Sequence, residues 1–457
     1  MAIYSVKIEW FLKQISFFIT KLIAISSHFT GFIDLCKMGA RSFTPNEIEN
    51  MKKHKYNGTD NSILGTLFLR SFWNWLVEFF PKSVAPNTIT FIGFLIEFVT
   101  FVITFSLSHC LTEKIPSWAC ILNGIGLFTY QTLDNLDGRQ ARRTGTSSPL
   151  GQFFDHGCDA LTGVFIMIKV AATLNMGSNM ITFIWVFTMG IGFVLTSWEE
   201  YITHSFYLGY LNGPDEGILL LSILHVFVGI FPDAADWFKT PIAYGIYLIC
   251  LAFTILPILF NVLRHSISDY DMRNRAFVSI IPVLITIILS ITLVVLYPQI
   301  SENVFFTMLS VLILQYQSQL IIVSYLVLRP PFKLFDPTLY PYWIFMCLGF
   351  ICPGIVASEL LSGIVLLSLV FVILYFDIGV IDGLSTGLGV SVFSITPVIE
   401  SHKETLNIVV DEEEEQNGNH TNYRINDESD DMMKGQGEFE DIVENEKEET
   451  VVSNSTA

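Results

Sequence analysis

Four aspartates in one short stretch have the spacing best suited to chemistry in this sequence. Asp134 and Asp137 are three residues apart, and Asp155 and Asp159 are four residues apart. Residues at these spacings share one face of an α-helix, so each pair predicts two neighbouring carboxylates. A purely oxygen ligand set favours Mg²⁺ or Mn²⁺, and no His/Cys set for zinc accompanies it. The stretch therefore predicts a site for two divalent cations that clamp a diphosphate.

Other residues of the same stretch suit a phosphate ligand. Arg142 can bind a phosphate through two parallel hydrogen bonds. Gly138 and Ala141 leave room for a ligand against the helix backbone. Arg143 fits a surface or topology role better, and Cys158 is interpreted as a small apolar filler.

The composition excludes a soluble globular protein. The 457 residues are 51% hydrophobic and only 15% charged, with a mean hydropathy of +0.53, whereas soluble proteins carry about 25% charged residues. The net charge of −18 is concentrated in residues 401–457, which contain 17 acidic and 4 basic side chains. Such a stretch cannot bury enough apolar surface to fold, so we expect a solvated acidic tail and no nucleic-acid partner.

The apolar segments predict an all-α integral membrane protein, because each is near the ~20 residues that a bilayer requires. The ten predicted spans are 88–108, 116–134, 153–175, 180–198, 216–232, 241–262, 276–297, 304–327, 339–356 and 360–380. The aspartates then lie where the second span ends and the third begins. Charges at this depth are costly and usually functional.

The basic residues predict the orientation. Arg and Lys are concentrated in the loops after the second, sixth and eighth spans, which places these loops, the aspartates and both termini in the cytosol. The first 35 residues resemble a surface amphipathic helix more than a signal peptide. We expect four regions: an N-terminal part (1–83), the catalytic helices (84–262), additional spans for dimerisation or lipid entry (263–396) and the acidic tail (397–457).

The stretch also resembles the signature of the class I CDP-alcohol phosphotransferase family. Every fixed position is present: Asp134-x2-Asp137-Gly138-x2-Ala141-Arg142-x8-Gly151-x3-Asp155-x3-Asp159. Residues 85–90 and 212–217 are similar to the eukaryotic choline/ethanolamine phosphotransferase branch. The resemblance covers roughly residues 45–390.

The resemblance implies a reaction and roles for individual residues. Members of the family transfer a phospho-alcohol from a CDP-alcohol to a lipid hydroxyl, here diacylglycerol, and release CMP. The four aspartates would hold two Mg²⁺ ions, with Mn²⁺ as a substitute, and Asn87 and Arg142 would hold the CDP moiety. His156 would be the base, with Asp159 as the fallback. A homodimer in the endoplasmic reticulum or Golgi membrane is also a family expectation.

One position departs from the pattern of this branch. Gln152 lies one turn before His156, where a glutamate commonly stands, so it can orient the imidazole but cannot stabilise an imidazolium by charge. The choice between ethanolamine and choline stays open. Glu199 and Glu216, on the side of the aspartates and with Trp198 and Tyr201 near Glu199, are candidates for binding an ammonium headgroup.

Alternative functions remain open at this level. An intramembrane prenyltransferase also uses aspartates and Mg²⁺, but its two motifs lie far apart in the chain. Another member of the superfamily, for example one transferring inositol, is disfavoured because those chains are generally shorter. A secondary transporter would carry polar residues and broken helices in both halves, and a pseudoenzyme scaffold would not need an intact signature.

Overall fold

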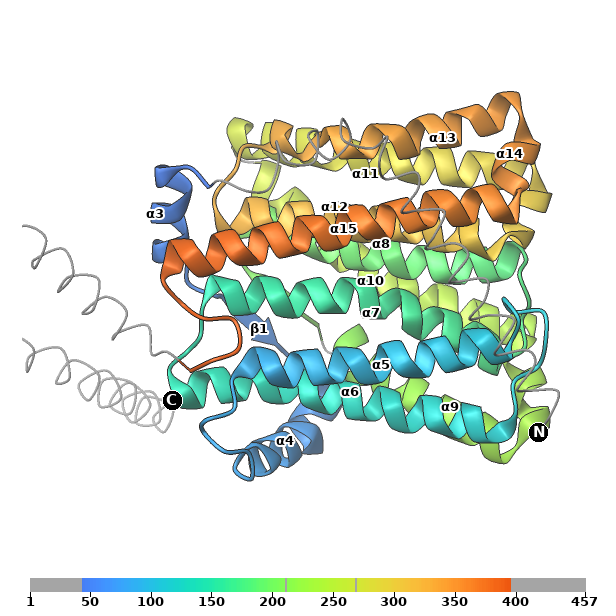
Figure 1. Ribbon diagram of the computed structural model, residues 1–457, viewed down its shortest axis with the longest axis horizontal. Helices are drawn as coiled ribbons and strands as arrows, with labels where there is room; N and C mark the ends of the chain where they lie inside the picture. Colours follow the sequence, from blue (N-terminus) through green and yellow to red (C-terminus); the bar gives the residue numbers. More distant parts are fainter. Residues whose placement is uncertain (1–42, 210–211, 268, 396–457) are drawn as a thin grey trace, which may run out of the picture. The chain divides into compact units, whose positions relative to one another are not determined.

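The computed structural model describes residues 43–395 except 210, 211 and 268. The predicted amphipathic helix in the first 35 residues and the acidic tail lie outside these residues. Helices dominate the described part, and most of them are long and run side by side (Figure 1). They are α5 Pro86–Leu107, α6 Ser117–Thr144, α7 Pro149–Thr173, α8 Met180–Thr203, α9 Ile218–Ile230, α10 Pro241–Ile267, α11 Tyr270–Leu296, α12 Val304–Leu326, α13 Tyr340–Ile351, α14 Pro353–Ala357 and α15 Glu359–Leu388.

Short elements connect and cap these helices. Before α5 stand α3 Pro45–Lys53, β1 Gly58–Asp60, the π-helix η1 Gly65–Leu69 and α4 Arg70–Val77; after α8 come β2 Phe206–Leu208 and the π-helix η2 Gly213–Gly217. The 3₁₀ turns are η3 Pro232–Lys239, η4 Pro298–Glu302, η5 Pro331–Leu334 and η6 Pro337–Leu339. The parallel pair β1–β2, with Gly58 opposite Phe206, is a feature that the all-α prediction did not include.

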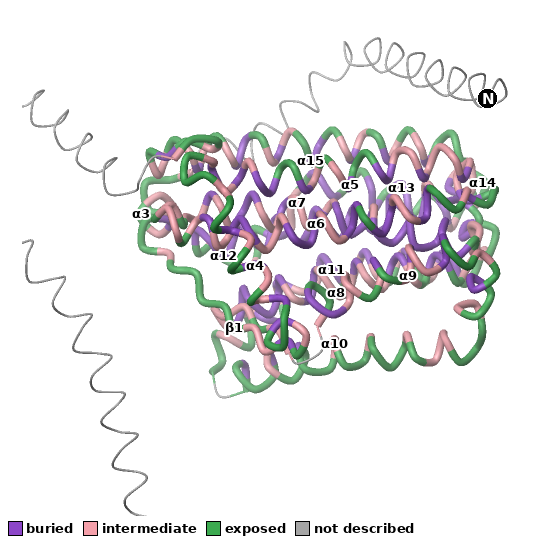
Figure 2. The backbone as a smooth tube through the Cα atoms, turned by 90° about the horizontal axis from the view of Figure 1, so that it is seen from below, coloured by how far each residue is buried: buried purple, intermediate pink, exposed green. Residues whose placement is uncertain are grey.

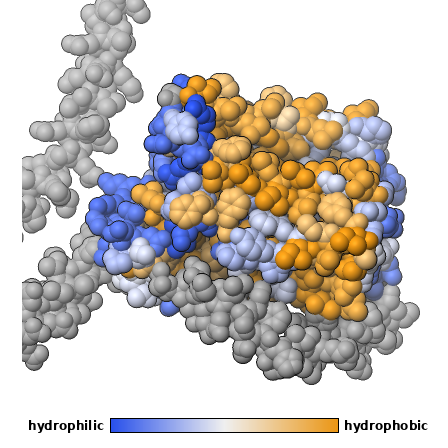
Figure 3. Space-filling model, turned by 90° about the horizontal axis from the view of Figure 1, so that it is seen from above, coloured by the Kyte–Doolittle hydropathy of each residue, from blue (hydrophilic) through white to orange (hydrophobic). Residues whose placement is uncertain are grey.

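The helices confirm the prediction of a multi-pass membrane protein. Each of the ten predicted segments falls on a long helix or helix pair, and eight described helical segments are long and apolar enough to cross a bilayer. The charged helices α6 and α7 are not among those eight. Figure 3 shows hydrophobic side chains over the middle of the helices and hydrophilic ones at the end where α3 lies.

Helix α12 forms the centre of the helical core. All of its residues except the half-buried Phe305 are buried, and it packs against α7, α8 and α15. By contrast, α10 is exposed over most of its length (Figure 2), as expected for a helix that faces lipid. Helices α12 and α15, which follow residue 262, pack directly on α7, the helix that carries Asp155.

Glycines allow the close approach of α6 and α9. A Cβ atom on Gly124 would lie 2.6 Å from the backbone oxygen of Ser222, and one on Gly229 would lie 2.9 Å from that of Ser117. Real Cβ atoms do not come this close to a backbone atom, so larger residues would separate the helices. Small residues at membrane helix contacts serve this purpose.

The segment before α5 is fastened to the rest of the molecule at several points. Glu47 of α3 pairs with Arg329 at 2.6 Å, and Asn50 donates to the carbonyl of Val327 at 3.1 Å. Glu216 accepts from the Ser62 hydroxyl at 2.6 Å and from the Leu64 backbone at 3.0 Å. These contacts hold residues 54–56 at the end of the helices where α6 meets α7.

Candidate active site

The turn between α6 and α7 positions the aspartates. Helix α6 ends at Gly145, whose φ of 66° is left-handed and suits glycine. Helix α7 begins after Ser148, whose side chain accepts from the backbone of Gly151 at 3.2 Å, with Pro149 in the first turn. The motif from Asp134 to Arg142 is therefore helical, as its spacing predicted.

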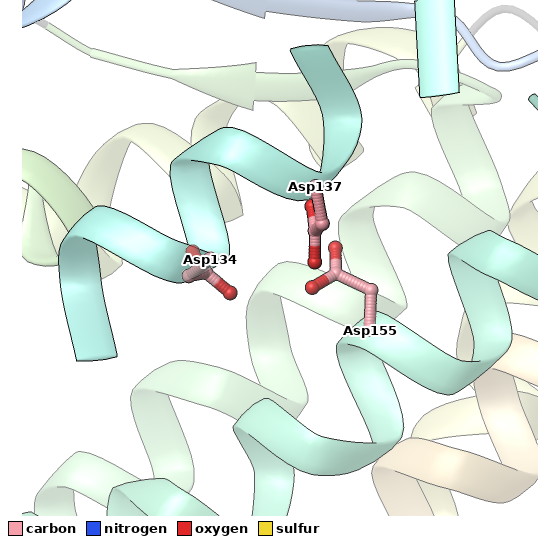
Figure 4. Close-up of side chains that lie close together, drawn as sticks. All are labelled: Asp134, Asp137 and Asp155. Atoms are coloured by element: carbon pink, nitrogen blue, oxygen red, sulfur yellow. The ribbon is translucent and has the colours of Figure 1, made fainter. Parts of the chain in front are cut away.

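Three of the four aspartates converge. Ligand oxygens of Asp134, Asp137 and Asp155 lie within 4.8 Å of one another. Figure 4 shows Asp134 and Asp137 on one helix pointing toward Asp155 on the next. One oxygen each of Asp134 and Asp155 is buried and has no hydrogen-bond partner in the described part of the chain. Carboxylates that approach so closely require a cation or a shared proton, so this donor set fits a hard divalent ion.

Asp159 lies beside this group rather than in it. The Tyr130 hydroxyl donates to one oxygen of Asp159. The Asp159 carboxylate is also in hydrogen-bonding contact with the Asp134 carboxylate. The Thr90 hydroxyl donates to Asp137 in a similar way. Tyr130 and Thr90 thus fix two of the predicted ligands from α6 and α5.

A cavity of about 600 Å³ opens next to the carboxylates. Of the predicted site residues, those that line it are Asn87, Asp134, Asp137, Gly138, Ala141, Arg142, Gln152, Asp155 and His156. The segment at His54–Tyr56 and residues after α15, including Val390 and Val392, complete the wall. The cavity therefore collects most of the residues that the sequence motif singled out.

The residues predicted to bind the CDP moiety contribute to this cavity in different ways. A Cβ on Gly138 would meet only the guanidinium of Arg142, at 3.5 Å, so the glycine leaves space open in front of that side chain. Asn87 donates to the carbonyl of Val392 at 2.9 Å. Arg143 instead donates to the carbonyls of Val77 and Phe80 at 2.6 and 2.8 Å, which ties α4 to α6.

Gln152 has partners that the sequence did not predict. Its amide nitrogen donates to Glu200 at 2.9 Å, and its amide oxygen lies 2.9 Å from Nε2 of His54. Its hydrogen bonds thus run to these two residues rather than to His156, the ring it was expected to orient. The His156 ring instead lies 5.4 Å from that of Phe206.

The two headgroup candidates have structural partners. Glu199 accepts from Asn261 of α10 at 2.7 Å, and Glu216 is committed to the segment around Ser62. Neither residue lines the cavity. The hydrogen-bond partners of Glu199 and Glu216 therefore lie outside the cavity wall.

Comparison with known sequences then decides the family. The profile of the CDP-alcohol phosphatidyltransferase family matches residues 83–328, which contain all four aspartates. The chain belongs to this family. The predicted resemblance is thereby confirmed.

Similar CDP-alcohol phosphatidyltransferase family proteins occur in several eukaryotes. An uncharacterised class I member from Schizosaccharomyces pombe is 33% identical over 67% of this chain and 82% of its own. Choline/ethanolaminephosphotransferase 2 of Arabidopsis thaliana is 37% identical over 51% of this chain and 57% of its own. A Dictyostelium discoideum class I member is 44% identical over 43% of this chain and 49% of its own. For several of these curated relatives, the chain spans about half of their length.

Some residues of this family member's site could not be identified from the motif. His54 and Tyr56 come from the N-terminal segment, and Val390 and Val392 from the other end of the described chain. Their sequence surroundings carry no chemical signature. Glu200 was visible in the sequence as a neighbour of Glu199, but only its contact with Gln152 distinguishes the two.

Proposed function

We propose that the chain transfers phosphoethanolamine or phosphocholine from the CDP-alcohol to diacylglycerol, giving the phospholipid and CMP. The observation that carries the proposal is the convergence of Asp134, Asp137 and Asp155 beside a cavity that His156 and Arg142 also line. Relatives named choline/ethanolaminephosphotransferase and cholinephosphotransferase support this headgroup class.

The carboxylates would hold two Mg²⁺ ions, or Mn²⁺ as a substitute. Asp134, Asp137 and Asp155 offer the converging oxygens, and Asp159 completes the predicted set. When bound, the ions would neutralise the diphosphate oxygens and the charge that develops on departing CMP.

The remaining groups handle the substrates and the proton. Arg142 and Asn87 hold the CDP moiety, with Gly138 and Ala141 leaving space for it. His156 accepts the proton of the diacylglycerol hydroxyl. The hydroxyl oxygen forms a bond to the β-phosphorus while the bond from that phosphorus to the CMP oxygen breaks. The proton ends on His156 and the electron pair on CMP.

The distribution of basic residues indicates on which side of the membrane the site lies. We propose that the site faces the cytosol of the endoplasmic reticulum or Golgi, where a soluble CDP-alcohol reaches it and diacylglycerol enters from the bilayer. Residues 84–262 supply the catalytic helices, and residues 263–396 supply helices for lipid entry or a homodimer. Most of α10, the helix that spans the boundary between these two regions, is exposed and is available to either lipid or a second copy.

The product lipid tests this function. Purified protein in liposomes containing diacylglycerol and Mg²⁺ is supplied with labelled CDP-ethanolamine, CDP-choline or a CDP-alcohol with an uncharged headgroup. We expect labelled phosphatidylethanolamine or phosphatidylcholine without any ion gradient. Labelled lipid only from the uncharged alcohol would favour another member of the superfamily. Gradient-dependent uptake without a lipid product would favour a transporter.

A further inference from the structure

Glu200, at the end of α8, is a buried carboxylate that forms no ion pair with the described lysines and arginines. Only 1% of its surface is exposed, and Gln152 donates to one of its oxygens. No lysine or arginine among the described residues forms an ion pair with it, although such pairs occur elsewhere, for example between Glu47 and Arg329. Burial of an unpaired carboxylate is costly, so this position suits a cation that arrives with a ligand.

The nearby histidine does not supply that cation. His54 is linked to Glu200 through Gln152. Burial lowers the pKa of His54, and the hydrogen bond that His54 donates to the Gln152 amide oxygen offsets this only in part. His54 is therefore neutral at physiological pH. This chain of hydrogen bonds therefore gives Glu200 no cationic partner among the described residues.

Two tyrosine rings lie near Glu200. Tyr56 lines the cavity and exposes 55% of its surface. Tyr325 packs edge-on against His54 with 5.0 Å between ring centroids. Both tyrosines lie within electrostatic range of Glu200. A carboxylate with aromatic faces is an arrangement that binds ammonium groups.

Gln152, which contacts Glu200, also lies close to the predicted metal ligand Asp155 along α7. Gln152 and Asp155 are three residues apart on α7 and both line the cavity. One helical turn advances about 5.4 Å, which a two-carbon alcohol can span. The alcohol of a diphosphate held at Asp155 would therefore have Gln152 and Tyr56 within reach along the cavity wall.

We propose that Glu200 and Tyr56 form the subsite for the ammonium end of the CDP-alcohol. Glu200 supplies the negative charge behind Gln152, and the Tyr56 ring supplies a cation–π contact at the cavity surface. This inference rests on the proposed function and deepens it by assigning headgroup recognition to Glu200 instead of Glu199.

The test separates headgroup binding from binding of the nucleotide. The full-length protein in liposomes is assayed for KM and kcat with CDP-ethanolamine and CDP-choline, and for inhibition by CMP, which lacks the headgroup. Glu200→Gln should raise both KM values about tenfold or more, while kcat changes less and the CMP inhibition constant stays the same. Glu199→Gln is the matched variant, because that side chain is turned to Asn261, and it should leave KM unchanged.

Substitution of Tyr56 is a second, independent test that leaves the buried residues unchanged. Tyr56→Ala should raise KM severalfold, whereas Tyr56→Phe keeps the ring and should preserve KM. Unchanged KM in both Glu200→Gln and Tyr56→Ala would overturn the proposal, as would an equal rise in the CMP inhibition constant or an effect of Glu199→Gln alone. Absence of turnover in the unsubstituted protein would instead contradict the proposed function.

Discussion

Asp134 of α6 and Asp155 of α7 bring carboxylate oxygens within 4.8 Å of each other from different helices. Each also keeps a buried oxygen that lacks a hydrogen-bond partner in the part of the chain that the structure describes. Such a pair is repulsive unless a cation or a shared proton lies between its members, and a bound cation relieves the repulsion without a proton. We therefore expect the free energy of unfolding to depend on divalent cations.

Mg²⁺ should stabilise the folded protein, and the effect should depend on Asp155. A hundredfold excess over Kd corresponds to about 2.7 kcal/mol for one site, which thermal unfolding with and without chelator can detect. Asp155→Asn removes a ligand and one charge, so it should weaken the response to Mg²⁺. The same Mg²⁺ response in Asp155→Asn and unsubstituted protein would mean that the ion binds elsewhere.

His156→Gln should reduce kcat and leave KM for the CDP-alcohol nearly unchanged. Loss of a general base typically costs about 10²–10⁴ in rate, and His156 contributes no charge that holds the diphosphate. Steady-state kinetics with saturating diacylglycerol gives both constants. A parallel rise in KM with little loss of kcat would assign His156 to substrate binding instead.

The local part of the site could be predicted from the sequence, because helical spacing alone sets which aspartates share a face. The short connection between α6 and α7 then brings Asp155 to the other pair. The segment at His54 and Tyr56 could not be predicted in this way. It reaches the cavity through long-range contacts such as Glu47 with Arg329 and β1 with β2.

The sequence also could not show which of Glu199 and Glu200 contacts Gln152. Adjacent helical residues point about 100° apart, so one of them faces Gln152 and the other faces Asn261. Residue type is identical at both positions. Only the packing of α8 against α7 and α10 decides which carboxylate contacts Gln152, a residue of the cavity wall.

The ion pair between Glu47 and Arg329 should make docking of α3 pH-dependent. Burial alone would raise the pKa of Glu47, but the hydrogen bonds from Arg329 and Thr44 hold it below its ordinary value of 4.5. A lowered carboxyl pKa contributes stability above the unfolded-state value, and this stability is lost as the pH falls through the folded-state value. Amide hydrogen exchange across α3 should therefore accelerate below about pH 4.5.

The substitution Glu47→Gln checks this interpretation. It should speed the exchange of α3 at neutral pH and remove the acid-dependent step. Glu49→Gln is the matched control, because Glu49 is exposed and pairs only with Lys53 within α3 in the described structure. An acid-dependent step that survives in Glu47→Gln would assign it to another group.

Gly124→Ala should destabilise the contact between α6 and α9. The added Cβ would lie 2.6 Å from the backbone oxygen of Ser222. Such overpacking typically lowers the free energy of unfolding by about 1–3 kcal/mol. Gly192→Ala is the control within α8, because a Cβ there meets nothing within 4 Å. Thermal unfolding in the same detergent should separate the two variants, and equal unfolding temperatures would contradict the predicted steric clash.

The central claim is that the aspartate cluster supports a metal-dependent transfer from a CDP-alcohol. The most direct measurement is CMP release from CDP-ethanolamine and CDP-choline with diacylglycerol, with Mg²⁺ or with chelator. Asp155→Asn is compared with Asp233→Asn, which alters an exposed residue in η3. We predict release that requires Mg²⁺, is lost in Asp155→Asn and persists in Asp233→Asn. Release that continues in chelator or in Asp155→Asn would contradict the account.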